Sequence, residues 1–188
     1  MDEISLYNNI IKKEIEEKYE TFDNLIFTNY FSSVFESTEF SRVKTDNYGD
    51  AGVDYMFFTF NRKLVLEKDD LVEYKSKNNR IDVYFIQVKD RRELDSSVPN
   101  KFIEFIQNLV KNTQPQHYNE SIIENIEFFN YLVTEYALEA KFHFHFYYFS
   151  RSGKKQVDSA TDLKGRFDSL KSQCDLIDFV EDTEIRIE

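Results

Sequence analysis

The sequence has little of three things: cysteine, basic charge and long apolar runs. Cys174 is the only cysteine among 188 residues, which excludes an internal disulfide and indicates a reducing compartment. No uncharged apolar run approaches the length of a membrane span, and the N-terminus lacks the basic and apolar regions of a signal peptide. These absences predict a cytoplasmic protein that does not insert into a membrane.

Basic residues are outnumbered by acidic ones. Lysine and arginine total 24 against 35 aspartates and glutamates, a net charge of −11 at pH 7. Because nucleic acids are bound through clustered lysine and arginine, this balance argues against a broad basic surface, although it leaves room for a local one. Acidic residues crowd into 14–20 and 175–188. Four basic residues lie close together elsewhere: Lys89, Arg91, Arg92 and Lys101.

Aromatic residues are abundant, with 19 phenylalanines and 12 tyrosines, and 41% of the chain is hydrophobic. This is ample material for a packed core, so we expect a globular chain. The length suits a single domain over 1–188. Within it we expect N-terminal helices over 1–38, a core that carries the site over 40–150, and a helix and strand over 151–188.

Two short apolar runs organise the chain, one over 48–58 and the other over 81–89. Both are rich in β-branched and aromatic residues, which indicates buried strands. Each carries polar residues, Asp54 in the first run and Gln87 and Lys89 in the second. The period of two in a strand places Gln87 and Lys89 on one face. If the strands are neighbours, a carboxylate, an amide and an ammonium converge, and their burial needs a reason.

The remaining periodicity predicts an α/β chain with a mixed central sheet flanked by helices, whose later strands are parallel to their neighbours. We expect helices over 5–19, from Asp23 to about Glu36, over 102–110, over 121–140 and over 162–174. We expect an exposed hairpin, or a strand with a mobile turn, within 61–80. We also expect a strictly alternating strand over 141–149 and a final short strand over 176–180.

The polar residues of the two central runs suit a divalent metal. Asp54, the Gln87 amide oxygen and a strand carbonyl such as that of Val88 are hard oxygen donors, which Mg²⁺ prefers, with Mn²⁺ as an alternative. A nearby ammonium such as Lys89 can orient a water molecule and stabilise charge that develops on a phosphate. The set therefore predicts a site that cleaves phosphodiester bonds.

This pattern resembles the PD-(D/E)xK nuclease superfamily, in which an aspartate opens one strand and an acid or glutamine, followed two residues later by lysine, lies on the next. Asp54, Gln87 and Lys89 match it in the Gln-x-Lys variant. The loop with Gly49, Asp50 and Gly52, followed by the later Ile-Gln-x-Lys, is similar to the N-terminal domain of the abortive-infection phage-resistance family, with Val-Asp here in place of its Ile-Asp.

The resemblance implies a restriction-endonuclease-like fold and a metal-dependent nuclease in bacterial defence against phage, acting on nucleic acid, with DNA preferred over RNA. Asp54, Gln87 and Lys89 are the implied catalytic residues, and Asp54, Gln87, Val88 and Glu36 the implied metal ligands. Glu17 is the other candidate for the helical glutamate. Members of the family are usually longer, so further C-terminal domains or a homo-oligomer are expected.

Each residue also has a simpler interpretation. Asp54 could cap a turn, Gln87 could lie on an edge strand, and Lys89 could extend to water. A nuclease-like fold that no longer cuts and binds nucleic acid or protein is the main alternative function. A third is a protein-interaction domain whose aromatic strands support an oligomer.

His143 and His145 lie two apart in the alternating strand and so share a face. Such a pair can bind Zn²⁺, but no third ligand stands nearby in the sequence. We therefore interpret both as polar residues on the less buried face of the sheet. Cys174 is interpreted as a small core residue rather than a nucleophile.

Overall fold

The computed structural model describes residues 13, 21–35, 40–45, 48–71, 79–152 and 154–188. The chain divides into two compact units, Met1–Phe40 and Ser41–Glu188.

The first unit contains one described helix, α2, over Phe22–Tyr30. It begins earlier than expected, because Thr21 rather than Asp23 is the N-cap and accepts a hydrogen bond of 3.2 Å from the Asn24 N–H. It also ends well before Glu36, since Thr28 and Asn29 in its last turn and Ser32 and Ser33 just after it have side chains that compete for backbone hydrogen bonds. The predicted helix over 5–19 lies outside the described residues except for Lys13, which is helical.

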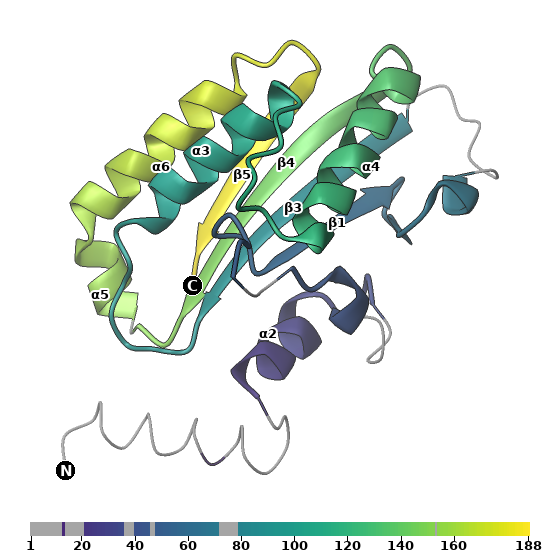
Figure 1. Cartoon of the computed structure of the whole chain (residues 1–188). Coiled ribbons are helices and arrows are strands. Elements are labelled where there is room, and N and C mark those ends of the chain that lie inside the picture. Colours follow the sequence, from purple (N-terminus) through teal and green to yellow (C-terminus); the bar gives the residue numbers. More distant parts are fainter. Residues whose placement is uncertain (1–12, 14–20, 36–39, 46–47, 72–78, 153) are drawn as a thin grey trace, which may run out of the picture. The chain divides into compact units, whose positions relative to one another are not determined.

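The second unit is built on a five-stranded mixed sheet in the order β2-β1-β3-β4-β5 (Figure 1). Strand β1 is antiparallel to both β2 and β3, whereas β3, β4 and β5 are parallel. This confirms the predicted mixed α/β sheet flanked by helices. The strands are β1 Tyr55–Phe60, β2 Lys63–Val65, β3 Asn79–Lys89, β4 Ala140–Ser150 and β5 Val180–Ile187.

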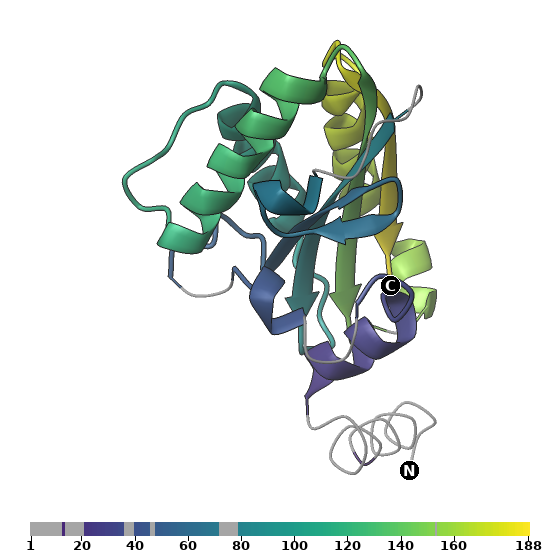
Figure 2. The ribbon, with the colours of Figure 1, turned by 90° about the vertical axis from the view of Figure 1, so that its right-hand side faces the viewer.

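Three long helices cover one face of this sheet, with α3 between α6 and α4 (Figures 1 and 2). Their apolar residues join those of β1, β3 and β4 in one core, in which Phe102, Phe129 and Phe146 are fully buried. The helices are α3 Val98–Val110, α4 Glu120–Tyr136 and α6 Thr161–Cys174, with short elements η2 Phe40–Val43, η3 Lys68–Leu71 and α5 Lys154–Ser159.

Several predicted boundaries are wrong. Helix α3 begins at Val98, because Pro99 fits the first turn, where no N–H is needed. Helix α4 ends at Tyr136, and Ala140 already belongs to β4. Helix α5 was not expected. The part of 61–80 that is described forms β2, paired with β1 as an antiparallel hairpin, and η3.

The largest error is the final strand, which runs over Val180–Ile187 instead of 176–180. The apolar run that suggested the earlier position leads into the strand. In the strand itself Val180, Ile185 and Ile187 pack against the core, Thr183 is buried, and charged residues fill the other positions. A half-buried edge strand with a register shift near its start has a weak alternation in sequence.

The two faces of the sheet follow the period of two in each strand. In β3, Ile81, Val83 and Phe85 belong to the helix-covered core, so Gln87 and Lys89 share that face. Asp82 and His145 belong to the opposite face, where they meet across β3 and β4. Within the described residues, no helix combines the length and the hydrophobicity that crossing a membrane requires.

Candidate functional site

The register of β1 and β3 brings Asp54 and Gln87 together. Tyr55 pairs with Ile86 in the antiparallel ladder, and the Asp54 N–H donates to the Ile86 carbonyl at 2.8 Å. Asp54 therefore lies opposite Gln87 at the end of the sheet where β3 and β4 finish. The two strands are neighbours, which is the condition that the sequence left open, and Gln87 lies on a central strand rather than an edge.

One oxygen of Asp54 gathers the polar contacts of the site. Its Oδ2 accepts hydrogen bonds from the Val88 N–H, at 2.7 Å, and from Gln87 Nε2. The Lys89 ammonium lies 4.0 Å from the same oxygen. Asp54 is buried and Gln87 is completely buried, while the Lys89 side chain is 26% exposed. A carboxylate, an amide and an ammonium therefore converge, with the ammonium on the solvent side.

The carboxyl group of Asp54 is poised for proton exchange near neutral pH. Burial is the largest influence and raises the pKa of Asp54 from 3.8 to about 6, although Lys89 and the Val88 hydrogen bond lower it. The neighbouring Asp50 raises it further. Perturbed carboxyl groups of this kind are concentrated at functional sites.

The loop before β1 holds Asp54 through contacts that its sequence makes possible. Gly49 and Gly52 have φ values of 90° and 78°, which suit glycine. Asp50 closes the turn by accepting from the Gly52 N–H at 2.8 Å. On the other side, Thr45 donates its N–H to the Asp54 carbonyl at 2.8 Å. The backbone on both sides of the carboxylate is thus fixed.

Three oxygens of the site are suited to a divalent cation. Gln87 Oε1 is buried without a hydrogen-bond partner, an arrangement that costs free energy unless something binds there. The contacts of Asp54 with the described residues all use Oδ2, so Oδ1 stays available. Because the N–H and the carbonyl of one strand residue point to the same side, we expect the Val88 carbonyl to face Asp54, which the Val88 N–H contacts.

The predicted metal set is only partly present in the described structure. Glu36 and Glu17 lie outside the described residues. Across the described ranges, no three His, Cys, Asp or Glu side chains form a metal-binding group. The donors that fit a cation are therefore one carboxylate, one amide and one carbonyl, which suit a single hard ion such as Mg²⁺ with several waters.

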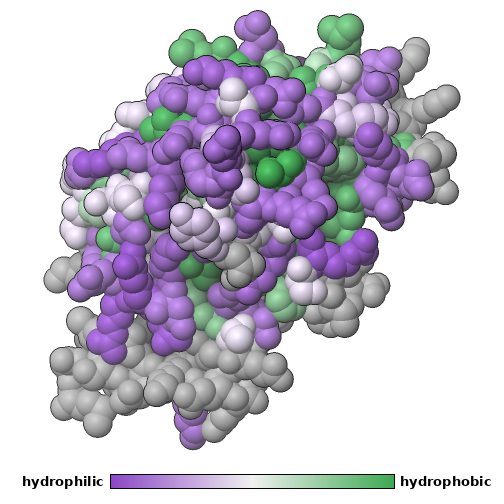
Figure 3. Space-filling model, in the orientation of Figure 1, coloured by the Kyte–Doolittle hydropathy of each residue, from purple (hydrophilic) through white to green (hydrophobic). Residues whose placement is uncertain are grey.

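The end of the sheet near the site carries the basic residues that the sequence grouped together. Arg91 pairs with Asp95 at 2.6 Å. Arg92 and Lys101 are exposed, and the aliphatic part of Lys101 packs over Gly52. Figure 3 shows a largely hydrophilic surface over α3, α4 and α6. Lys89, Arg92 and Lys101 make up what we call the basic rim of the site, and the acidic Asp90 and Glu93 lie in the same part of the chain.

Sequence reasoning missed two groups near the site. Asp50 was considered only as part of the loop with Gly49 and Gly52, yet its charge acts on Asp54. Tyr148 is the residue of β4 that pairs with Gln87 of β3. Its hydroxyl accepts a hydrogen bond from the Asp95 N–H at 2.7 Å, which ties the loop after β3 to β4. The Gly-Asp-x-Gly pattern was the available signal for Asp50, whereas nothing local in the sequence marks Tyr148.

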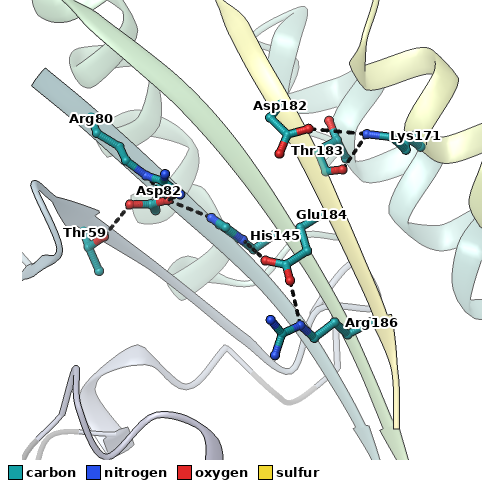
Figure 4. A network of polar contacts seen from close by, with 9 residues as sticks. All are labelled: Thr59, Arg80, Asp82, His145, Lys171, Asp182, Thr183, Glu184 and Arg186. Carbon is teal, nitrogen blue, oxygen red and sulfur yellow. Dashed lines mark hydrogen bonds and ion pairs between the residues drawn. The ribbon is translucent and has the colours of Figure 1, made fainter. Parts of the chain in front are cut away.

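A second polar cluster crosses four strands on the opposite face (Figure 4). Asp82 accepts from Thr59 Oγ1 at 3.2 Å and from Arg80 Nε at 2.8 Å. His145 places Nε2 2.7 Å from Asp82 and Nδ1 2.9 Å from Glu184. Ionised carboxylates only accept hydrogen bonds, so both contacts are satisfied when the ring carries two protons.

This cluster corrects the interpretation of the histidines. They share the predicted face, but His145 is buried at 7% exposure and held between carboxylates. Burial is the largest influence on Asp82 and raises its pKa, but hydrogen bonds from His145 and Arg80 outweigh it and hold the pKa at about 2. Burial lowers the pKa of His143. The cluster is closed by its own hydrogen bonds and offers no ligand position.

Two other features, a surface hollow and Cys174, are not part of the candidate site. A hollow of about 950 Å³ lies at the other end of the sheet, where β3 and β4 begin, but Lys141 and Glu181 in its lining neutralise each other at 2.6 Å. Cys174 is fully buried in the core, and burial raises the pKa of its thiol to about 12. This confirms Cys174 as a core residue and argues against a thiolate nucleophile.

Comparison with known proteins identifies no relative: no family model matches the chain, and no curated protein and no solved structure matches it.

Proposed function

We propose that the Ser41–Glu188 unit is a metal-dependent nuclease domain with a restriction-endonuclease-like arrangement and the Gln-x-Lys form of its site. The observation that carries the proposal is the convergence of Asp54, Gln87 and Lys89 around a buried amide oxygen without a partner. Turn capping explains none of this, because the Asp54 side chain bonds across the sheet to β3 rather than to its own loop.

Asp54, Gln87 Oε1 and the Val88 carbonyl would hold Mg²⁺ or Mn²⁺. When bound, such an ion supplies Lewis acidity toward a phosphate and lowers the pKa of a coordinated water. The pKa of Asp54 near 6 leaves its carboxylate ionised at neutral pH. Gln87 Nε2 and the Val88 N–H orient that carboxylate, so that little reorganisation accompanies ligand binding.

Lys89 is the group placed to act on the scissile phosphate. Its ammonium lies on the solvent side of Asp54, at 4.0 Å, where it can donate to a phosphate oxygen or orient an attacking water. The basic rim, with Arg92 and Lys101 exposed, would hold the flanking phosphates. DNA is the preferred substrate and RNA the second.

The biological role is proposed from the sequence resemblance. The Gly/Asp loop and the Ile-Gln-x-Lys strand end are similar to those of the abortive-infection family, which supports a role in cytoplasmic defence against phage. A homo-oligomer is the partner proposed from the same resemblance.

A catalytically silent binding module is the second candidate. A neutral Gln87 stands where many nucleases have an acid, so the described donors carry a single negative charge. Such a site binds a cation weakly, and a domain that has lost cleavage would retain its basic rim.

The test is a titration of Mg²⁺ and Mn²⁺ with plasmid DNA and single-stranded RNA, comparing wild type with Asp54→Ala and Lys89→Ala. We expect metal-dependent cleavage that each variant reduces by at least a hundredfold, on the order of the loss seen when one transition-state stabilising group is removed. Lys111→Ala, at an exposed position beyond the far end of α3, is the matched control and should keep full activity.

Folding of each variant is checked by its far-ultraviolet circular dichroism and its unfolding midpoint. Cleavage that survives in folded Lys89→Ala would overturn the assignment. Nucleic-acid binding without cleavage by the wild type under either metal would favour the silent module.

A further inference from the structure

Tyr48 is the one strongly exposed aromatic residue in the described part of the Ser41–Glu188 unit. Its relative exposure is 93%, whereas the other phenylalanines and tyrosines of that part are buried or partly buried. Isolated exposed hydrophobic residues are common on protein surfaces. The position of Tyr48, between two anchored backbone segments beside the candidate site, is what distinguishes it.

The backbone on both sides of Tyr48 is tied to Asn119. The Asn119 N–H donates to the Gly49 carbonyl at 3.0 Å, and Asn119 Nδ2 donates to the Thr45 carbonyl at 2.9 Å. Asn119 is itself held as the N-cap of α4, since its side chain accepts from the Ile122 N–H at 3.0 Å. Tyr48 therefore directly precedes a residue whose backbone is held in place, which lowers the entropy cost of using its ring in binding.

The same loop leads directly into the candidate site. Six peptide units join Tyr48 to Asp54, a span of about 20 Å at most, and the turn closed by Asp50 shortens it. Lys101 packs its stem on Gly52 in this loop and is exposed, which adds a positive charge on the same side. The Tyr48 ring and the Asp54 carboxylate are therefore carried by one short loop, close enough for a single polymer to contact both.

We propose that Tyr48 stacks on an unpaired base of single-stranded nucleic acid and positions the strand for the site, an inference that rests on the proposed nuclease function. Exposed aromatic rings in a loop that also contacts a lysine, as this loop contacts Lys101 at Gly52, are a means by which proteins hold single strands, because every base offers a flat face. Bases within a duplex are already stacked on their neighbours and have no free face for the ring. The substrate class is therefore single-stranded DNA or RNA, or a splayed end of a duplex.

The test measures binding in EDTA, where cleavage does not interfere. Fluorescence anisotropy would follow labelled 12-nucleotide single strands of DNA and of RNA with wild type, Tyr48→Ala and Tyr48→Phe. We expect Tyr48→Ala to weaken binding about tenfold to a hundredfold, and Tyr48→Phe, which keeps the ring, to bind like wild type. Leu138→Ala, at a fully exposed leucine beside the hollow at the other end of the sheet, is the matched control and should change nothing.

Two further oligonucleotides show whether the Tyr48 ring acts by stacking on a base. An abasic oligonucleotide with the same phosphates should bind wild type and Tyr48→Ala equally, because the ring has no base to contact. A strand that contains 2-aminopurine should lose emission on binding wild type but not Tyr48→Ala. The DNA and RNA arms decide which polymer is held.

The outcomes separate this inference from the nuclease assignment. Equal affinity of Tyr48→Ala and wild type, or an equal loss on the abasic strand, would overturn the stacking role even if cleavage is observed. If the wild type binds none of the oligonucleotides, the stacking role is also overturned. A contact with another protein would then remain as a role for the Tyr48 ring. Absence of cleavage together with the Tyr48→Ala effect would leave the stacking role intact and remove the nuclease.

Discussion

The side chain of Gln87 donates a hydrogen bond from Nε2 to Asp54 Oδ2 and leaves its own Oε1 buried without a partner. One end of the amide thus stabilises the carboxylate while the other adds an uncompensated cost, roughly 1 to 3 kcal/mol for a buried polar atom of this kind. A bound cation would satisfy the oxygen. The pair therefore links the stability of the sheet to occupancy of the site.

Gln87→Glu should make the free energy of unfolding depend strongly on bound metal. It places a second buried carboxylate beside Asp54, and like charges this close cannot both ionise without a large penalty. In EDTA at pH 8 we expect a loss of roughly 2 to 4 kcal/mol in the free energy of unfolding, which acid or Mn²⁺ should restore. Urea denaturation with and without Mn²⁺ measures this. Gln107→Glu, on the exposed face of α3, should show neither effect, and a metal-independent loss at Gln87 would contradict the idea.

Asp54→Asn should become more stable relative to wild type as the pH rises. The folded protein raises the pKa of Asp54 from 3.8 to about 6, so the stabilising contribution of its protonated form is complete below about pH 4 and is lost as the pH passes 6. Asparagine stays neutral throughout. The difference between variant and wild type should grow by about 2 kcal/mol between pH 4.0 and 7.5.

Urea denaturation of dilute protein in EDTA, at pH 4.0 and at pH 7.5, measures this difference. Both pH values lie away from the isoelectric point, near 4.8, where the protein is least soluble. A constant difference across the range would show that burial does not raise the carboxyl pKa. The same variant should lose metal-dependent cleavage, so a gain in stability and a loss of activity are expected together.

Asp82→Asn should destabilise the fold at neutral pH. Hydrogen bonds from His145 and Arg80 hold the pKa of Asp82 at about 2, so its contribution is complete above about pH 4 and is lost as the pH falls through 2. We expect a loss of about 2 kcal/mol at pH 7 that shrinks in acid. Thermal unfolding over this pH range measures it. Asp162→Asn, which removes an exposed ion pair with Arg166, should have little effect.

Gly49→Ala and Gly165→Ala should change stability in opposite directions. At Gly49 the φ of +90° strains any side chain, and an added Cβ would meet the His117 carbonyl and come within 2.9 Å of the Asn119 nitrogen. We expect a loss of at least 2 kcal/mol, together with weaker activity because this loop leads to Asp54. Gly165 lies in helix α6 with nothing within 4 Å of an added Cβ, so alanine should stabilise by about 1 kcal/mol. Chemical denaturation of both variants decides the comparison.

The local pattern of residues was enough to predict much of the fold. The alternation of Phe142, Phe144, Phe146 and Tyr148 identified β4, and the spacing of Leu163, Phe167 and Leu170 identified α6, because the periods of strands and helices are written directly in the side chains that they bury. Prediction from the local pattern failed for elements that are only partly buried. The edge strand β5 was placed too early, and α2 was extended past a Thr- and Ser-rich turn.

The sequence by itself determined which chemical groups the site contains and that Gln87 and Lys89 share a face, since a period of two requires it. Only the tertiary structure decided that Asp54 lies opposite Gln87, that one oxygen of the amide is without a partner, and that His145 is clamped by Asp82 and Glu184. These relationships depend on strand order and register, which are set by packing between residues 30 or more positions apart. Burial in that packing then sets the pKa of Asp54, which no local pattern contains.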